Sequence, residues 1–169
     1  MNVWPRLGSA LLAVLVAGGC SGMSGSAAPA AGASPAAGPT TTLFDGSSLD
    51  GWKHIGPGSF ALEPGGSIVS EGGMGLLYYT PTRFRDFVLD LDYKTDSPGT
   101  NSGIFVRFPQ QSDDPWYAVN NGYEIQIDDK ADPIHATGSV YTFSPPSEQA
   151  SRPAGEWNHY RIQVTGQHY

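Results

Sequence analysis

The chain has 169 residues, enough for one domain of ordinary size, of which 39% are hydrophobic and 15% charged. Nine Lys and Arg residues stand against sixteen Asp and Glu residues, so the net charge is −7. An acidic surface repels phosphate backbones, which argues against nucleic acid as a partner. The single cysteine excludes an internal disulfide. No uncharged apolar run reaches the length of about 18 residues that a membrane-spanning helix needs.

Residues 1–19 have the pattern of a lipoprotein-type signal peptide. Arg6 precedes a short apolar run, which ends in small residues at Ala17-Gly18-Gly19-Cys20. The last four residues resemble a bacterial lipobox, in which the cysteine is acylated and becomes the new amino terminus. We therefore expect export to the bacterial cell envelope and a lipid anchor on Cys20, without a membrane span. An ordinary secretory peptide with an incidental cysteine is the alternative.

Residues 20–42 carry no charge and consist mainly of Ala, Ser, Gly, Pro and Thr. Such a segment buries too little apolar surface to offset the entropy lost on ordering, so we expect a disordered tether. The folded domain is therefore predicted to occupy residues 43–169.

That domain shows the period-two alternation of β-strands and no sustained helical spacing. Gly- and Pro-rich turns separate the alternating segments, which predicts an all-β, antiparallel sandwich or jelly roll without helices. Residues 166–169 read as a turn and the start of another strand, so we expect a sandwich that is incomplete at its C-terminus. The expected strands surround Leu89, Ile104, Ile125 and Ile162, with shorter ones at Ser59–Glu63, Ser67–Glu71, Gly75–Tyr79 and Gly138–Thr142.

Two of the expected strands carry polar residues opposite their apolar ones. If both strands lie in one sheet, the polar rows share a face and Arg107 meets Glu124 across the strands. A guanidinium, carboxylates, amides and an aromatic ring suit a polar, ring-shaped ligand such as a sugar. A surface salt bridge of little energetic value is the structural alternative. The rows are Asn101, Gly103, Phe105 and Arg107 on one strand, and Glu124, Gln126 and Asp128 on the other.

Two loops add further candidates. The segment from Asp128 to His135 concentrates carboxylates beside an imidazole. Its oxygens suit a divalent cation, and His135 suits proton transfer near neutral pH, whereas a solvated acidic loop is the plainer interpretation. Trp116 follows an acidic, Pro-containing segment in an expected loop, where it either stacks on a sugar or covers the core.

A conventional two-carboxylate glycosidase is not favoured by this pattern. Glu124 and Asp128 are four residues apart on one strand, which separates their α-carbons by about 13 Å. Retaining and inverting enzymes hold their carboxyl groups roughly 5–9.5 Å apart. The intermediate position, which has a workable spacing, is occupied by Gln126.

Five motifs in chain order carry a family resemblance. They are Leu43-Phe44-Asp45-Gly46 with Leu49-Asp50-Gly51-Trp52, then Asn101–Arg107, Gly122–Asp128, Thr137–Tyr141 and Pro153–Asn158. In this order they resemble the 3-keto-disaccharide hydrolase family. The resemblance implies a concanavalin A-like jelly roll and an exported bacterial enzyme that acts on glycosides oxidised at C3 of the sugar.

The C3 ketone acidifies the C2 proton, so the glycosidic bond can be broken by elimination followed by addition of water. Our hypothesis makes Glu124 the base, and gives Arg107 and Asn101 the task of stabilising the enolate oxygen. His135 or Asp128 then protonates the departing oxygen or holds a divalent metal ion. A non-catalytic carbohydrate-binding module and a passive surface interaction domain are the alternatives. The residues expected to contact the sugar are Asn101, Phe105, Gln126, Asp128, Tyr141 and Trp116.

Overall fold

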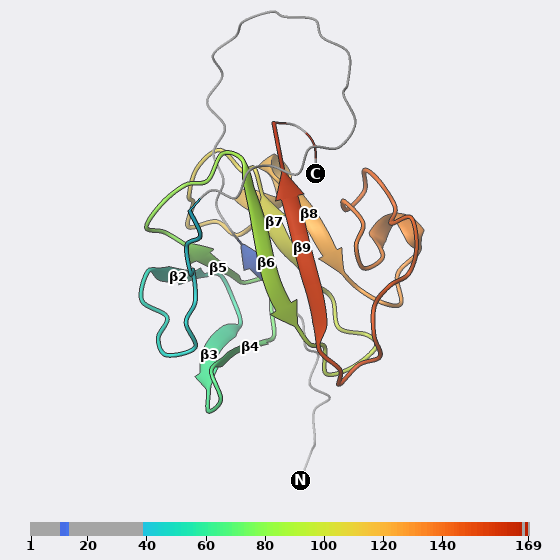
Figure 1. The fold of residues 1–169 in the computed structure, drawn as a ribbon, viewed down its shortest axis with the longest axis horizontal. Coiled ribbons are helices and arrows are strands. Elements are labelled where there is room, and N and C mark those ends of the chain that lie inside the picture. Colours follow the sequence, from blue (N-terminus) through green and yellow to red (C-terminus); the bar gives the residue numbers. More distant parts are fainter. Residues whose placement is uncertain (1–10, 14–38, 167, 169) are drawn as a thin grey trace, which may run out of the picture.

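Almost every element of the computed structural model, which describes residues 11–13, 39–166 and 168, is a β-strand (Figure 1). This confirms the predicted all-β class. The strands are β1 (Leu11–Ala13), β2 (Trp52–Ile55), β3 (Ser59–Glu63), β4 (Ser67–Glu71), β5 (Leu76–Tyr79), β6 (Phe87–Tyr93), β7 (Ser102–Val106), β8 (Tyr123–Ile127) and β9 (Asn158–Val164). One short helix, α1 (Trp116–Asn121), and one 3-10 turn, η1 (Pro133–His135), complete the described elements.

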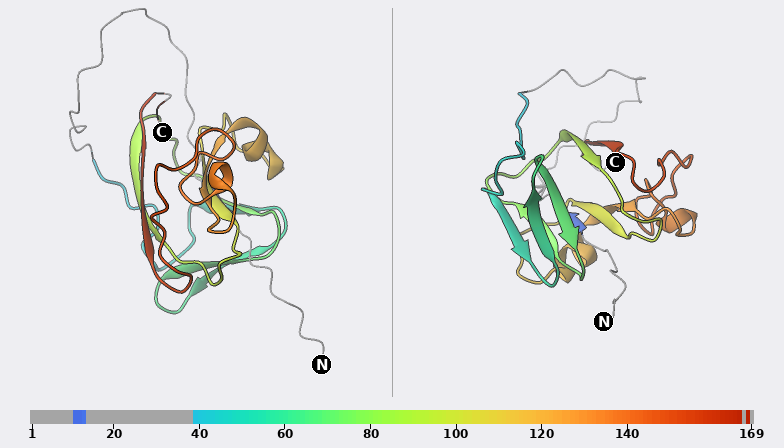
Figure 2. Two further views of the ribbon diagram at one scale, coloured as in Figure 1. Left: turned by 90° about the vertical axis from the view of Figure 1, so that its right-hand side faces the viewer. Right: turned by 90° about the horizontal axis from the view of Figure 1, so that it is seen from below.

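The strands form two facing layers and a separate hairpin. The central sheet has the order β2-β5-β1-β7-β8, and the antiparallel strands β6 and β9 form an outer pair that faces it. In the side view of Figure 2 these layers stand opposite each other. β3 and β4 form the hairpin. The layered arrangement results from the alternation, because each strand has an apolar side to bury.

The outer pair shows the expected alternation most clearly. Leu89 and Leu91 of β6 face inward, where they pack against the cluster that contains Ile162. Asp90 lies opposite Arg161, which donates two hydrogen bonds of 2.9 Å to its carboxylate on the outer surface. Burial on one side and ion pairing on the other therefore fix this register.

The central sheet buries residues on both faces, which the alternation did not predict. Its inner face packs on the outer pair through Ile104, Val106 and Ile125. Its opposite face, called here the α1 face, carries a second cluster of Ile55, Leu76, Tyr78, Phe105, Phe108 and Ala118. Consequently β7 is buried along almost its whole length.

The alternation of β7 breaks at Arg107. Unbroken alternation would point Phe108 inward with Ile104 and Val106, but it packs with Phe105 on the α1 face instead. Arg107 has a φ of 63°, in the left-handed region that residues other than glycine rarely adopt. This backbone conformation reverses the side on which the following residue lies.

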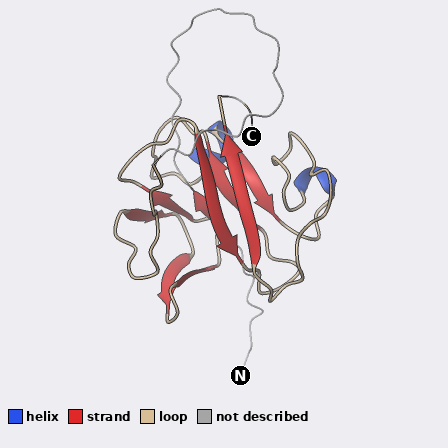
Figure 3. Ribbon diagram, viewed as in Figure 1, coloured by secondary structure: helices blue, strands red, loops and turns tan. Residues whose placement is uncertain are grey.

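Helix α1 occupies a segment that we expected to be a loop (Figure 3). Six residues are too few for helical periodicity to show in the sequence. Gly122 ends the helix by donating its amide to the Ala118 carbonyl oxygen at 2.8 Å, and a Cβ here would lie only 2.9 Å from the Val106 carbonyl oxygen. Among the described residues, no helix has the length and apolarity to cross a membrane.

The expected strand at Gly138–Thr142 does not form. Val140 makes only isolated bridges, to Ile125 and to Ser144. Its amide and carbonyl groups instead close a tight turn, because Val140 and Ser144 exchange hydrogen bonds of 3.0 Å in both directions. This turn lies against the edge of β8.

Strand β1 comes from the expected signal peptide, whereas Cys20 and the tether up to residue 38 lie outside the described residues. β1 runs parallel to both β5 and β7, although every other strand pair is antiparallel. If the predicted cleavage before Cys20 takes place, it removes a strand from the middle of the central sheet. β5 and β7 then lose their shared backbone partner.

We expect a variant of this chain without residues 1–19 to be less stable than the whole chain. The facing backbone groups of β5 and β7 lose partners, which costs on the order of 2–4 kcal/mol at roughly 1 kcal/mol per hydrogen bond. Urea unfolding of the two proteins measures the difference, and hydrogen exchange locates it at β5 and β7. Equal midpoints and equal exchange rates would show that β1 contributes nothing to the sheet.

Candidate functional site

Glu124 lies on the α1 face of the central sheet, at the base of a small cleft. The β7–β8 register places it opposite Phe105, and places Gln126 opposite Gly103. Directly opposed residues of an antiparallel pair share a face, so these four residues lie together. The cleft has a volume of about 40 Å³. It is lined by Phe105, Val119, Gly122, Glu124, Tyr141, Thr142 and Phe143.

The Glu124 side chain lies across the backbone of Gly103. A Cβ at Gly103 would stand 2.2 Å from Glu124 Oε1 and 2.6 Å from its Cγ. No other residue type leaves this space, because every L side chain begins with that atom. Gly103 is therefore required for the position of the Glu124 carboxyl group rather than for a turn.

Gln126 is 1% exposed and contacts the same carboxyl group. When the side-chain amide is oriented so that its nitrogen faces acceptors and its oxygen faces donors, the nitrogen donates to the Ser102 carbonyl oxygen at 2.8 Å and to Glu124 Oε1 at 3.1 Å. The reverse orientation aims the nitrogen at Asn101 Oδ1, 3.4 Å away, and sets the amide oxygen against other acceptors. Gln126 thus positions Glu124, and its burial is at odds with the expected contact with a sugar.

Burial raises the pKa of Glu124 to about 7. An ionised carboxylate loses hydration inside the cleft, which favours the protonated form. The hydrogen bond from Gln126 opposes part of this effect, because it favours the charged form. A carboxyl group with this pKa can both accept and return a proton near neutral pH.

Arg107 does not meet Glu124, so that expectation was wrong. The residue opposite Glu124 is Phe105, and the guanidinium of Arg107 donates to Asp86 Oδ1 at 3.1 Å. The Gly166 amide and this guanidinium hold the pKa of Asp86 below its usual value. The positive φ of Arg107 explains the difference, since it turns the side chain away from the row that Asn101, Gly103 and Phe105 continue.

The structure also changes the interpretation of Phe105 and Asp128. Phe105 is 1% exposed and packs with Tyr78 and α1, so it forms the floor of the cleft rather than an open stacking surface. Asp128 Oδ1 accepts the amides of Lys130 and Ala131, which is a local turn. No group of three or more His, Cys, Asp or Glu side chains placed to hold a metal ion was found in the described part of the chain.

His135 and Tyr141 are brought together beside the cleft. Their ring centroids are 4.7 Å apart, and His135 Nδ1 pairs with Asp132 Oδ1. Tyr141 lines the cleft, while its amide donates to the Glu124 carbonyl oxygen at 2.9 Å. Trp116 is the first residue of α1 and is 54% exposed, one turn before Val119 of the cleft lining. Asn101 is exposed at the start of the row that faces Glu124.

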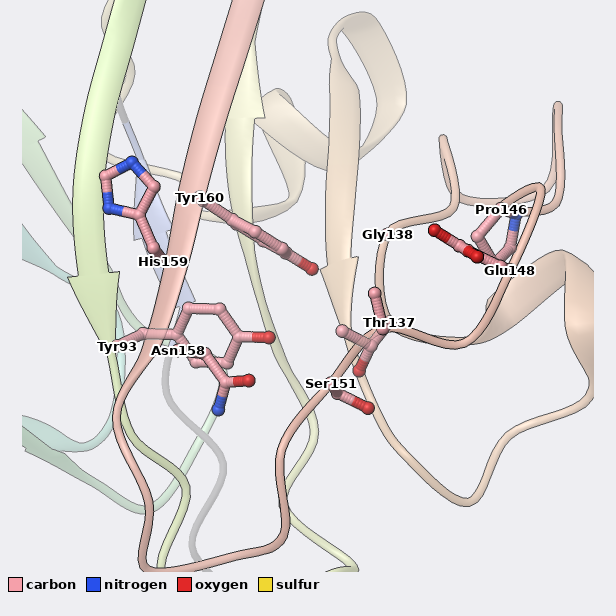
Figure 4. Close-up of a pocket in the computed structure, with 10 residues that line it drawn as sticks. Tyr93, Thr137, Gly138, Pro146, Glu148, Ser151, Asn158, His159 and Tyr160 are labelled. Atoms are coloured by element: carbon pink, nitrogen blue, oxygen red, sulfur yellow. The ribbon is translucent and has the colours of Figure 1, made fainter.

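A larger cleft of about 100 Å³ lies beside the outer pair, where Tyr93 and Tyr160 point toward the Thr137–Gly138 segment (Figure 4). Its Tyr160 and Asn158 side chains already have internal partners. Tyr160 donates to the Gln126 carbonyl oxygen at 2.6 Å, and the Asn158 amide bonds to the backbone of Arg152 and Glu156. Burial raises the pKa values of both tyrosines, which keeps them neutral. We therefore favour the Glu124 cleft as the site, although it is smaller.

Two residues of the Glu124 cleft have roles that sequence reasoning missed. Gly103 was placed in the polar row without a function, because nothing in the sequence shows that a side chain crosses it. Phe143 was not singled out at all. It is a large hydrophobic residue next to the Ser144-Pro145-Pro146 turn signal, and exposure on such a turn was the available clue.

Replacing Gly103 with Ala should displace the Glu124 carboxyl group toward solvent. Gly103 does not have a positive φ, so the backbone accepts alanine and the flexible Glu124 side chain moves instead. We expect the pKa of Glu124 to fall from about 7 toward its usual value of 4.5, as measured by NMR titration of the labelled carboxyl carbon. Gly99→Ala is the matched control, because a Cβ there meets nothing within 4 Å. An unchanged pKa in Gly103→Ala would contradict the close approach.

Replacing Glu124 with Gln should change how stability depends on pH. The pKa of Glu124 is higher in the folded state, so its contribution to stability falls as pH rises from about 4.5 through about 7. Between pH 4 and pH 8, the free energy of unfolding of Glu124→Gln should therefore rise by about 3 kcal/mol relative to that of the wild type, at 1.36 kcal/mol per pKa unit. Urea unfolding at a series of pH values measures this. A difference that stays constant with pH would show that Glu124 is not buried as described.

Comparisons with known proteins place these features in a family. The chain is 27% identical to a 3-keto-disaccharide hydrolase of Bacteroides thetaiotaomicron, over 73% of this chain and 51% of that protein. It thus spans about half the length of this curated relative. A solved structure from Parabacteroides distasonis, provisionally named a glycosyl hydrolase, has a similar fold. Its TM-score is 0.55 at 21% identity, over 74% of this chain and 63% of that chain.

The match to a family model covers most of the described domain. Residues 39–169 match the model of the 3-keto-alpha-glucoside-1,2-lyase-like domain, and this range contains the whole Glu124 cleft and all five sequence motifs. The resemblance inferred from those motifs is confirmed. The chain therefore belongs to the family of 3-keto-alpha-glucoside-1,2-lyase-like domains.

Proposed function

We propose that this domain cleaves glycosides whose sugar carries a ketone at C3, and that Glu124 is the base that removes the C2 proton. The observation that carries the proposal is the Glu124 carboxyl group, held over Gly103 at the base of a cleft with a pKa of about 7. The names of the family and of the Bacteroides relative support the substrate class.

The proposed reaction begins with transfer of the C2 proton to the Glu124 carboxylate. The electrons of the C2–H bond form a C2=C3 double bond, and the C3 oxygen becomes an enolate. When the enolate collapses back to the ketone, the electrons form a C1=C2 double bond and expel the glycosidic oxygen from C1. That oxygen takes up a proton, and water then adds across the C1=C2 bond. The net result is hydrolysis without an oxocarbenium ion.

The local environment of Glu124 suits this chemistry better than conventional hydrolysis. Glu124 is the one carboxylate among the described residues that line the cleft, so no second carboxyl group stands where a two-carboxylate mechanism needs it. A base is most effective when its pKa lies near the working pH, because it is then both available and strong enough. Its protonated form can then return the proton to the departing oxygen.

The roles of the neighbouring residues follow from the positions described above. Asn101 keeps the proposed role of donating to the enolate oxygen, because its side chain lies 3.4 Å from the side-chain amide of Gln126, which contacts Glu124. Arg107 loses that role because Asp86 occupies its guanidinium. His135 remains a second candidate proton donor, since its ring packs on Tyr141 of the cleft lining.

Glu124→Gln tests the base. We expect release of aglycone from a 4-nitrophenyl 3-keto-glucoside to fall by about a hundredfold to ten-thousandfold, the usual contribution of a general base. In the wild type, kcat/KM should rise with pH through about 7, because the reaction needs ionised Glu124. The absorbance of released nitrophenol measures both.

Glu148→Gln is the matched control, because Glu148 is an exposed carboxylate that lines the larger cleft instead. We expect this variant to keep wild-type activity. Undiminished turnover by Glu124→Gln would remove Glu124 from the base role. Loss of turnover in Glu148→Gln alone would move the site to the larger cleft, and binding of 3-keto and plain glucosides without any cleavage would favour a carbohydrate-binding module.

A further inference from the structure

Phe143 exposes more of its surface than any other large hydrophobic residue in the described part of the chain. It is 67% exposed, compared with 54% for Trp116 and 49% for Trp157. Moving an aromatic ring out of water lowers the free energy, so a ring that stays in contact with solvent forgoes this stabilisation. A single exposed ring is common on protein surfaces, so the position of Phe143 decides what it can do.

The backbone around Phe143 is strained in a way that holds the ring outward. Thr142 has a φ of 65°, which is rare for a β-branched residue. The surrounding turn is closed by hydrogen bonds between Val140 and Ser144, and the Phe143 amide donates to the Val140 carbonyl oxygen at 2.8 Å. Strained residues of this kind persist where the surrounding structure fixes them, and they concentrate at functional sites.

The strained turn belongs to the Glu124 cleft. Thr142 and Phe143 both line it, together with the Glu124 side chain. The Phe143 ring rests on the ring of Tyr123, with centroids 5.2 Å apart at an angle of 55°. Tyr123 precedes Glu124 in β8 and packs with the inner-face cluster, so Phe143 lies at the edge of the sheet, between the two faces. One side of Phe143 is thereby fixed, while most of its surface stays open to solvent.

We propose that Phe143 is an aromatic platform on which the reacting sugar ring stacks beside Glu124. This inference rests on the proposed function, because it names how that site holds its substrate. A sugar ring presents C–H groups on its faces and hydroxyl groups at its rim, so a face can lie on an aromatic ring while the rim stays hydrated. A base that removes the C2 proton approaches one face of the ring, which leaves the other face for the platform.

Trp157, which is also exposed, has a different environment from Phe143. Lys94 Nζ lies 5.0 Å from the centroid of the Trp157 ring, so a cation already covers that aromatic face. Trp157 also lies outside the lining of both clefts. Trp157→Ala therefore makes a suitable control, because it removes an exposed aromatic ring that lines neither cleft.

The test compares Phe143→Ala, Phe143→Leu and Phe143→Tyr in the whole chain. With a 4-nitrophenyl 3-keto-glucoside, we expect KM to rise about three- to tenfold for Ala and Leu, the usual range for an aromatic contact, with kcat within about twofold of wild type. Tyr should restore the wild-type KM because it keeps the ring. Trp157→Ala should leave KM unchanged, and equal unfolding midpoints should confirm that all variants fold.

Binding measurements separate this proposal from the proposed function. In the Glu124→Gln background, calorimetric titration with methyl 3-keto-glucoside should show about three- to tenfold weaker binding when Phe143 is Ala or Leu. If the wild type cleaves neither sugar, and plain methyl glucoside shows the same loss of binding without the ring, the platform proposal stands and the proposed enzymatic function is wrong. The platform proposal is wrong if Phe143→Ala leaves both binding and KM unchanged. It is also wrong if Phe143→Leu binds as well as Phe143→Tyr.

Discussion

The candidate site depends on one close contact, the Glu124 carboxyl group lying across the backbone of Gly103. This contact exists because β7 and β8 pair in the register that places Phe105 opposite Glu124 and Gly103 opposite Gln126. Burial then raises the pKa of the carboxyl group, and the Gln126 amide fixes one of its oxygens. A register shift of one residue would send Glu124 to the other face of the sheet and remove all three effects at once.

The two faces of the central sheet have different roles. The inner face packs against the outer pair and stabilises the sandwich mainly through apolar contacts. The α1 face is also largely buried, but it stays open at the edge of β8, where the turn from Val140 to Ser144 replaces a paired strand. A cleft forms at this edge because a tight turn covers less of the sheet than a strand with its following loop. The strain at Thr142 and the exposure of Phe143 are local costs at the same edge.

Several features could be predicted from alternation alone. The strands β6 and β9 appear close to their expected positions, because each alternates more buried with exposed residues. β3 and β4 also occupy their expected ranges, as a hairpin that stays largely exposed. The row of Gly103 and Phe105 with Glu124 and Gln126 was also expected on a shared face, as the register confirms. Prediction was less accurate where local backbone geometry overrides periodicity. Arg107 leaves the row and Phe108 changes side because of one positive φ, which nothing in the residue type Arg announces.

The sequence by itself determined the all-β class, the acidic charge and the family, and it singled out Glu124 as a candidate, since alternation and short motifs are local properties. Only the tertiary structure decided which residues surround that carboxylate. The cleft combines β7, β8, the end of α1 and the 141–143 turn, and their approach depends on packing between segments far apart in the chain. The burial behind the raised pKa of Glu124 arises from those combined surfaces, so no window of the sequence contains it.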